Sequence, residues 1–442
     1  MATEYRLAQT PSEAYNACHP EIPLKSGDLR YVDLNSARGG LNSVQDDFLQ
    51  AIAPEGTGAI RGGTCAGLVT GHRGNGKTSE LLRLKAQLEG RGCRVVYFDV
   101  EEPLGLSNVD AIAVLLLIAE QVAADAAAGS KPVAQDLVDD VGAFFDHVET
   151  VSSQGTAFEG ALEAGASVGG GWPGIAKLFA KFTAGVKAGS KTYTEVRSTL
   201  ERGFADFATR VNNVLRAAER ESGKRLVVIV DGLEKLQYQQ VTPDLSSHHM
   251  LFVKQAALLK APCCHVIYTV PMSLVYEQNL EFSPKHVLPM VDVSIPKAVD
   301  LMRELLAKRV DLSACFENPD EAVPKVAKAS GGCLRDLLRI VQTAMTAQSG
   351  AVSTDRVQRS VQELAKEYDR LIRESDREIL LSVLRVGSCD GVGRSGELLH
   401  NRVILEYENG ERSVRLHPTI LGLARFRRWT QAEPGLFDKV NG

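Results

Sequence analysis

The chain has 442 residues, 44% of them hydrophobic and 24% charged, with a formal net charge of −5. This length allows two or three domains with substantial cores, and the negative charge gives no general attraction to nucleic acid or anionic membrane. No apolar run reaches the ~20 residues of a membrane span, and the N-terminus lacks the pattern of a signal peptide. The 8 cysteines have no C-x-x-C spacing, which favours buried thiols in a cytoplasmic protein.

Residues 1–55 are expected to form an N-terminal segment with little regular structure. Turn residues such as Pro20, Pro23 and Gly27 interrupt it, and its apolar residues show little periodicity. This segment leads into a predicted α/β domain over residues 56–295.

The stretch GHRGNGKT, from Gly71 to Thr78, matches the phosphate-binding pattern G-x-x-x-x-G-K-[ST] at every fixed position. A buried strand is predicted just before it at Gly67–Thr70, and a helix after it from Ser79 to about Glu89. In this context the glycines let backbone N–H groups point at a phosphate, and the helix N-terminus adds positive potential. A glycine turn with a chance lysine is the alternative.

The sequence therefore predicts a nucleoside triphosphate site, with ATP and Mg²⁺ as its ligands. Lys77, solvated without phosphates, is expected to reach the β- and γ-phosphates, and the Thr78 hydroxyl to hold Mg²⁺. Arg30 and Tyr31, upstream of the first strand, are candidates to flank the base, with surface packing as the alternative. The expected nucleotide-binding residues are Gly71, Arg73, Gly74, Asn75, Gly76, Lys77, Thr78 and Ser79.

The next elements alternate between strand and helix. Cys93–Val100 is apolar on both faces, as buried parallel strands are, and Val109–Ala128 is a long apolar helix. This alternation is typical of an α/β domain with a parallel sheet. A region rich in Gly, Ala and Ser at about 129–200 is predicted to be a helical insertion, and Glu195–Arg220 a charged helix.

A second phosphate-site motif lies at Leu226–Glu234, where an apolar strand ends in an acid. Asp231 at the strand's carboxyl end is expected to hold Mg²⁺ together with Thr78. Glu234 is the candidate to orient or deprotonate the attacking water, with a surface glutamate as the alternative. A hydrolytic glutamate often directly follows the aspartate of such a strand, but in this chain that position is occupied by Gly232.

Two more strands and a helical region follow. His265–Pro271 is a predicted strand in which Thr269 is a candidate sensor of the γ-phosphate, or simply a strand-terminating threonine. His286–Val293 is predicted as the last core strand, and residues 296–362 as a helical lid. In that lid, Arg335 lies in the first turn of a helix, where a cation is disfavoured by the macrodipole. An anion across a cleft offsets that cost, so Arg335 is a candidate to meet the γ-phosphate; a helix-surface ion pair is the alternative.

Residues 363–442 are predicted to form a winged-helix-like domain. Ser375–Val386 and Ser395–His400 are expected helices, and Asn409-Gly410 joins two alternating stretches, the strongest short-range signal for a hairpin. A last helix is expected at Thr419–Trp429.

Together these motifs resemble those of AAA+/STAND-type P-loop ATPases, close to the origin-recognition-like and NACHT-like groups that end in a winged helix. The resemblance covers roughly residues 56–128 and 200–420. D-G-L-E at 231–234 resembles the NACHT-like Walker B, and S-G-G-x-L-R-D-L at 330–337 resembles the sensor-2 helix, which assigns that role to Arg335. It implies a P-loop NTPase parallel sheet with a helical lid, and nucleotide-dependent oligomerisation.

The chain departs from that family in two places. The insertion at 129–200 is outside the common pattern, and the loop Gly387–Gly393 leaves little room for the middle helix of a winged helix. An arginine finger cannot be placed; Arg202, Arg303 and Arg309 are candidates.

Three functions stay open on the sequence. The first is an ATP-driven switch that oligomerises and signals through a separate effector protein, as in bacterial antiviral systems. The second is a DNA-engaging ATPase, a loader or a regulator of transposition or replication. The third is a nucleotide-binding scaffold that barely turns over. Acids and bases look balanced in residues 363–442, which favours protein contact over groove binding.

Overall fold

The computed structural model describes residues 5–39, 42–53, 63–104, 109–129, 203–242, 245–276, 280–409 and 411–431, with a few positions between 133 and 141 and at 433 and 436. The predicted insertion at about 129–200 lies outside these residues, apart from its first positions.

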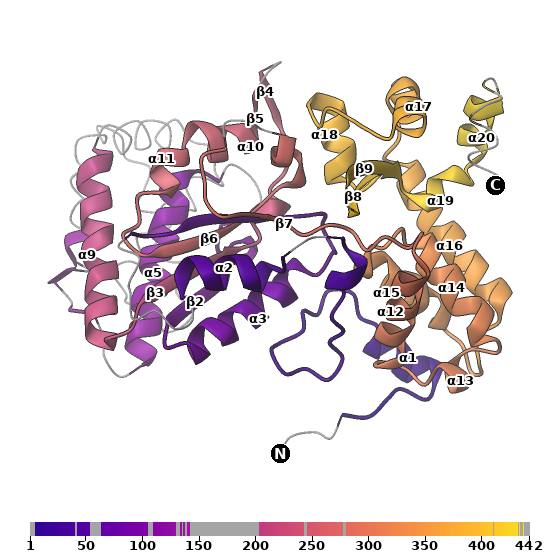
Figure 1. Ribbon diagram of the computed structural model, residues 1–442, viewed down its shortest axis with the longest axis horizontal. Coiled ribbons are helices and arrows are strands. Elements are labelled where there is room, and N and C mark those ends of the chain that lie inside the picture. Colours follow the sequence, from indigo (N-terminus) through magenta and orange to yellow (C-terminus); the bar gives the residue numbers. More distant parts are fainter. Residues whose placement is uncertain are drawn as a thin grey trace, which may run out of the picture.

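The centre of the fold is a five-stranded parallel sheet with the strand order β2-β3-β6-β1-β7 (Figure 1). Its strands are β1 (Ala66–Thr70), β2 (Arg94–Asp99), β3 (Leu226–Asp231), β6 (His265–Val270) and β7 (Lys285–Val287). Because β6 lies between β1 and β3, the carboxyl ends of these three strands meet at one edge of the sheet. Ligands of open parallel sheets bind outside such an edge.

Both faces of the sheet are covered by helices, as parallel strands with helical crossovers require. On one face, α2 (Val44–Ile52) and α3 (Lys77–Gly90) pack on the strands in a common hydrophobic cluster. On the other, α5 (Ala111–Ala128) and α9 (Phe204–Ser222) form a larger cluster with them. The predicted α/β fold is thereby confirmed.

Among the described residues, α5 is the one helix long and apolar enough to cross a membrane by length and composition. However, 72% of it is buried inside the structure, against the sheet and α9. Helix α5 therefore fits the core of an α/β domain.

A second group of helices, residues 296–369, lies beside the sheet (Figure 1). It consists of α12 (Pro296–Ala307), α13 (Leu312–Cys315), α14 (Pro319–Ala329), α15 (Leu334–Met345) and α16 (Thr354–Asp369). These helices share one hydrophobic cluster with the N-terminal helix α1 (Pro11–Ala17) and with the C-terminal elements. The helices of residues 296–369, which include the predicted lid and are called the lid below, thus pack together with the C-terminal region.

The C-terminal region contains two helices, a hairpin and two final helices. They are α17 (Arg377–Val386), α18 (Gly393–His400), β8 (Ile404–Asn409), β9 (Glu411–Leu416), α19 (Pro418–Leu421) and α20 (Ala424–Gln431). β8 and β9 pair in antiparallel fashion, with Ile404 opposite Leu416 at one end and Asn409 opposite Glu411 at the other, which confirms the predicted hairpin. The winged-helix assignment stays a prediction.

Short elements complete the fold. They are α4 (Glu101–Leu104), a hairpin of β4 (Gln240–Thr242) and β5 (Leu245–Ser246), α10 (Ser247–His249), a π-helix η4 (Met250–Lys254), α11 (Ala256–Leu259), and the 3₁₀ turns η1 (Asn35–Ala37), η3 (Leu233–Lys235), η5 (Met272–Tyr276) and η6 (Glu374–Asp376).

Three expectations about the elements were wrong. β7 ends at Val287, because Pro289 has no N–H for a strand ladder. The expected last helix is broken at Gly422 into α19 and α20. The N-terminal segment contains α1 and α2, and each begins with a capping box, at Thr10 and at Ser43. Those boxes were the available sequence signal for the two helices.

Candidate nucleotide site

The loop between β1 and α3 has the conformation that the phosphate-binding pattern predicts. Gly74 and Gly76 have φ angles of 80° and 89°, in the left-handed region that favours glycine. At Gly74 a Cβ atom would also lie 2.4 Å from the Cβ of Arg335. Helix α3 begins at Lys77, so its N-terminal N–H groups open into the loop.

Lys77 is buried, contrary to the expectation that it is solvated, with 3% of its surface exposed. Its Nζ donates to the carbonyl oxygens of Gly71 at 2.8 Å and His72 at 3.1 Å, and lies 3.6 Å from Glu234 Oε1. Burial lowers the pKa of Lys77, although the carboxylates of Glu234 and Asp231 oppose this shift. The loop's own carbonyls thus hold the ammonium at the strand edge.

Asp231 and Thr78, predicted together as Mg²⁺ ligands, are in direct contact. Thr78 Oγ1 donates to Asp231 Oδ2 at 2.7 Å, and the Tyr97 hydroxyl donates to the same oxygen at 2.7 Å. Burial raises the pKa of Asp231 to about 6, and the nearby Glu234 adds to the shift. A hydroxyl and a carboxylate oxygen beside a phosphate loop are the donors that Mg²⁺ prefers, so these residues fit the metal.

Glu234 lies in the turn η3 after β3 and is also buried. Among the described residues its Oε2 has no hydrogen-bond partner, and neither has Thr269 Oγ1. Burial raises the pKa of Glu234, but several nearby groups lower it, Lys77 most of all, and the net shift is downward. An ionised carboxylate with a free oxygen, next to the phosphate lysine, is chemically suited to accept a proton from water.

Gly232 is required by a neighbouring carboxylate. Its φ is 87°, and a Cβ there would lie 2.3 Å from Asp99 Oδ1 at the end of β2. Asp99 and Glu101 each accept a hydrogen bond from Lys235 Nζ at 2.7 Å. Asp99 therefore fills the space in which a glutamate directly after Asp231 would place its side chain.

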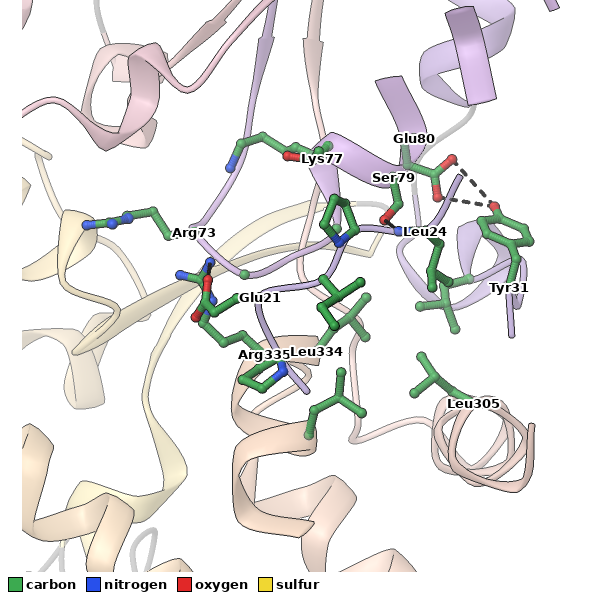
Figure 2. Close-up of a pocket in the computed structure, with 18 of the residues that line it drawn as sticks. Glu21, Leu24, Tyr31, Arg73, Lys77, Ser79, Glu80, Leu305, Leu334 and Arg335 are labelled. Atoms are coloured by element: carbon green, nitrogen blue, oxygen red, sulfur yellow. Dashed lines mark hydrogen bonds and ion pairs between the residues drawn. The ribbon is translucent and has the colours of Figure 1, made fainter. Parts of the chain in front are cut away.

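Arg335, predicted to meet the γ-phosphate, is paired with Glu21 in this structure, which is the ion pair that the sequence left open as the alternative. Its backbone N–H donates to the Gly74 carbonyl at 3.0 Å, and its Nη2 donates to Glu21 Oε2 at 2.9 Å. Figure 2 shows Glu21 beside Arg335 at the rim of the pocket, with Arg73 nearby. The lid helix α15 thus contacts the phosphate loop directly.

A pocket of about 220 Å³ lies between the loop, the lid and the N-terminal segment. Arg30 and Tyr31 line it together with Leu34, Leu305 and Leu338. The three leucines provide apolar surface of the kind that a nucleotide base packs on. That Arg30 and Tyr31 flank the base stays a prediction.

The remaining predicted loop residues have separate roles. Arg73, Gly74, Gly76 and Ser79 line the pocket. Asn75 is instead structural, because its Nδ2 donates to the carbonyl oxygens of Leu288 at 2.8 Å and Pro289 at 2.6 Å.

Two of the three arginine-finger candidates lie among the described residues, and Arg309 is one of the residues that line the pocket. Arg303 pairs with Asp320 at 2.7 Å. Arg309 is buried, and its Nη1 donates to the carbonyl oxygens of Leu305 and Arg30. Arg202 lies outside the described residues.

Sequence reasoning missed the contribution of the C-terminal region to this site. The backbone N–H of Glu406, in β8, donates to His72 Nε2 at 2.8 Å, and Arg402 Nη1 donates to the Arg73 carbonyl at 3.2 Å. His400 of α18 lies with its ring centroid 5.7 Å from that of His248. No local sequence signal joins residues so far apart along the chain. His72 and Arg73 occupy variable positions of the GHRGNGKT motif, and this was the one indication that their side chains could face a partner.

Comparisons with known proteins give only distant likenesses. No protein-family model matches the chain, and no curated protein matches it in sequence. Among solved structures, similar chains include the Walker-type ATPase PABY2304 of Pyrococcus abyssi, with 12% identity, a TM-score of 0.38, and coverage of 91% of this chain and 97% of that chain. The ORC1 protein of Aeropyrum pernix, in complex with DNA, has 14% identity, a TM-score of 0.38 and coverage of 98% of both chains.

A third similar structure is Cdc6p from Pyrobaculum aerophilum, with 11% identity, a TM-score of 0.35, and coverage of 96% of this chain and 98% of that chain. The assignment of the site in the present chain rests on its own geometry.

Proposed function

We propose that this chain binds and hydrolyses ATP with Mg²⁺, and that it works as a molecular switch together with a separate protein partner. The observation that carries the ATPase proposal is the contact at 2.7 Å between Thr78 Oγ1, directly after the buried Lys77, and Asp231 Oδ2 at the end of β3. A phosphate loop, a lysine and a hydroxyl–carboxylate pair at one sheet edge have the chemistry of a phosphoryl-transfer site.

Each residue has a chemical role in this proposal. Loop N–H groups and Lys77 bind the β- and γ-phosphates, while Thr78 and Asp231 hold Mg²⁺, which neutralises charge that develops on the phosphate oxygens. Glu234 accepts the proton of the attacking water, and the Thr269 hydroxyl, which lies near that carboxylate, orients the same water. When Lys77 contacts phosphate, its positive charge is no longer paired with the Glu234 carboxylate.

The switch part of the proposal is supported by contacts of the loop with two other parts of the chain. The lid contacts it through Arg335 and Gly74, and the C-terminal hairpin contacts it through Glu406 and His72. A shift of the loop backbone changes both contacts at once. In the proposal, these shared contacts convert nucleotide state into a change of shape or assembly.

Three C-terminal arginines are already paired with carboxylates, which favours protein contact over DNA binding, whereas Arg427 and Arg428 of α20 are exposed. Arg415 forms two hydrogen bonds with Asp292, at 2.8 and 3.0 Å, and Arg412 pairs with Glu406. Arg425 pairs with Asp369 at 2.8 Å. Guanidinium groups that are already neutralised are poor phosphate ligands. Homo-oligomerisation and a role in antiviral defence are the parts of the proposal that rest on the family resemblance alone.

Three measurements test the proposal. Purified protein should release phosphate from ATP only with Mg²⁺ present, and Lys77→Ala should neither bind nor hydrolyse ATP. Light scattering after size exclusion should give different masses with ATP and with ADP. Duplex DNA should bind weakly at physiological salt; sub-micromolar affinity that falls steeply with salt would replace the protein-partner proposal by the DNA-engaging one.

A further inference from the structure

A short stretch of the N-terminal segment, residues 20–24, crosses the mouth of the pocket; we refer to it as the strap. All five of its residues line the pocket, from Pro20 to Leu24. Leu24 donates its backbone N–H to Ser79 Oγ at 3.0 Å. Ser79 directly follows Thr78, whose hydroxyl is proposed to hold Mg²⁺. Figure 2 shows Glu21, Leu24 and Ser79 around the loop.

The strap is attached to both bodies that form the pocket. On its N-terminal side, α1 packs on α15, and Ala8 pairs with Val310 in a parallel β-bridge beside α12. On its C-terminal side, Tyr31 donates to Glu80 of α3 at 3.1 Å, and Arg38 donates to the Asn75 carbonyl at 2.8 Å. The strap therefore joins the lid to the sheet domain across the site.

Within the strap, Glu21 provides the one carboxylate in contact with Arg335 among the described residues. The Arg335 side chain is only 20% exposed, and its Nε is buried without a partner. Burial is the largest cause that lowers the pKa of Lys77 and of Arg73. The nearby charge of Arg335 lowers both pKa values further. Three cations thus converge on the loop, and Glu21 neutralises the one that the lid supplies.

We propose that Glu21 is a specificity-determining residue of this site, because its carboxylate competes with the terminal phosphate of a nucleoside triphosphate for Arg335. This inference rests on the proposed nucleotide site. A triphosphate that reaches Arg335 displaces Glu21 and frees the strap, whereas a diphosphate leaves the Glu21–Arg335 pair in place. The pair thereby makes triphosphate binding weaker than the site's cations alone would allow.

The expected effect is modest and can be measured. The Glu21 side chain is 57% exposed, so loss of the pair should tighten ATP binding about two- to fivefold, the range for an exposed ion pair. ADP binding should change by less than about 1.5-fold, because the pair persists in that complex.

The test is ATP and ADP titration calorimetry on Glu21→Ala and Glu21→Gln, with Mg²⁺ and physiological salt. Removing any negative charge near the pocket strengthens binding of the more highly charged ATP, so the variants are repeated in an Arg335→Ala background. The gain for ATP should vanish there if Arg335 mediates it. A matched control is Glu304→Ala, which removes a lid carboxylate that is 49% exposed and lies 3.0 Å from Lys308.

Each outcome decides the inference. It is overturned if Glu21→Ala leaves the ATP-to-ADP affinity ratio unchanged, tightens both ligands equally, or keeps its gain without Arg335. Glu21→Gln removes the charge of the side chain but keeps its shape, so it should retain at least part of the gain in ATP affinity. If Glu21→Ala gains affinity and Glu21→Gln does not, the strap acts by steric blocking. Failure of the site itself is seen independently, because Lys77→Ala would then bind ATP like the native chain.

Discussion

Replacing Glu234 by glutamine tests which group accepts the proton in the proposed hydrolysis. The amide keeps the shape of the side chain, which is 5% exposed, but it cannot take a proton at neutral pH. In the native protein the pKa of Glu234 is shifted downward in spite of its burial, mainly by Lys77, so the carboxylate is ionised under assay conditions.

Loss of a general base slows a reaction by roughly 10²–10⁴-fold, which corresponds to ~2.7–5.4 kcal/mol in the activation barrier. Because the proton acceptor acts in the transition state, ATP affinity should change by less than about threefold. Single-turnover hydrolysis of labelled ATP gives the rate, and calorimetry gives the affinity of the same preparation.

Asp99 is the matched control for this experiment. Its Oδ1 occupies the space of a side chain at position 232, so it is the competing carboxylate at the strand edge. Asp99→Asn should retain most of the rate. Native turnover in Glu234→Gln, together with a hundredfold loss in Asp99→Asn, would refute the assignment and move the base to β2.

The remaining predictions concern the other residues of the site. Lys77→Ala should abolish ATP binding, since it removes a charge-assisted phosphate contact; native affinity by calorimetry, on protein shown to be folded by circular dichroism, would contradict this. Asp231→Asn should abolish the increase in ATP affinity on adding Mg²⁺, and an increase that persists would place the metal elsewhere. Arg335→Ala should weaken ATP more than ADP, whereas an equal loss would assign Arg335 to structure. Gly232→Ala should destabilise the fold by ~1–3 kcal/mol, from its left-handed φ and the contact with Asp99; an unchanged denaturation midpoint would argue against that strain.

The parts of the site that lie within one short stretch could be predicted from the sequence. The loop from Gly71 to Thr78 and the strand ending at Asp231 carry their chemistry in local order, because a phosphate loop needs glycines and a lysine at fixed spacing. The hairpin at Asn409 was predicted for a similar reason, since an Asn-Gly pair between two alternating stretches is a local sequence signal.

The missed contacts all join distant parts of the chain. Tyr97 reaches Asp231 across 134 positions, Glu21 reaches Arg335 across 314, and Glu406 reaches His72 across 334. A tyrosine in a buried strand or a glutamate in a proline-rich segment has many possible partners, and only strand order and domain packing select one. Burial of Lys77 was missed because it depends on the folded loop, whose carbonyls at Gly71 and His72 accept from its Nζ, and on Glu234 beside it.

The hairpin contact with the phosphate loop ties the C-terminal region to the loop, and the C-terminal region also packs on the buried face of the lid. Asp336 of the lid accepts a hydrogen bond from Tyr368 at 2.6 Å and lies 3.4 Å from His417 and 3.8 Å from Arg402. Cutting the chain before residue 363 would leave that buried carboxylate without these three neighbours and the His72 ring without its donor. Homologous chains should therefore exchange their C-terminal regions only together with the lid, and recombination or truncation experiments that separate the two should lose the fold along with the nucleotide.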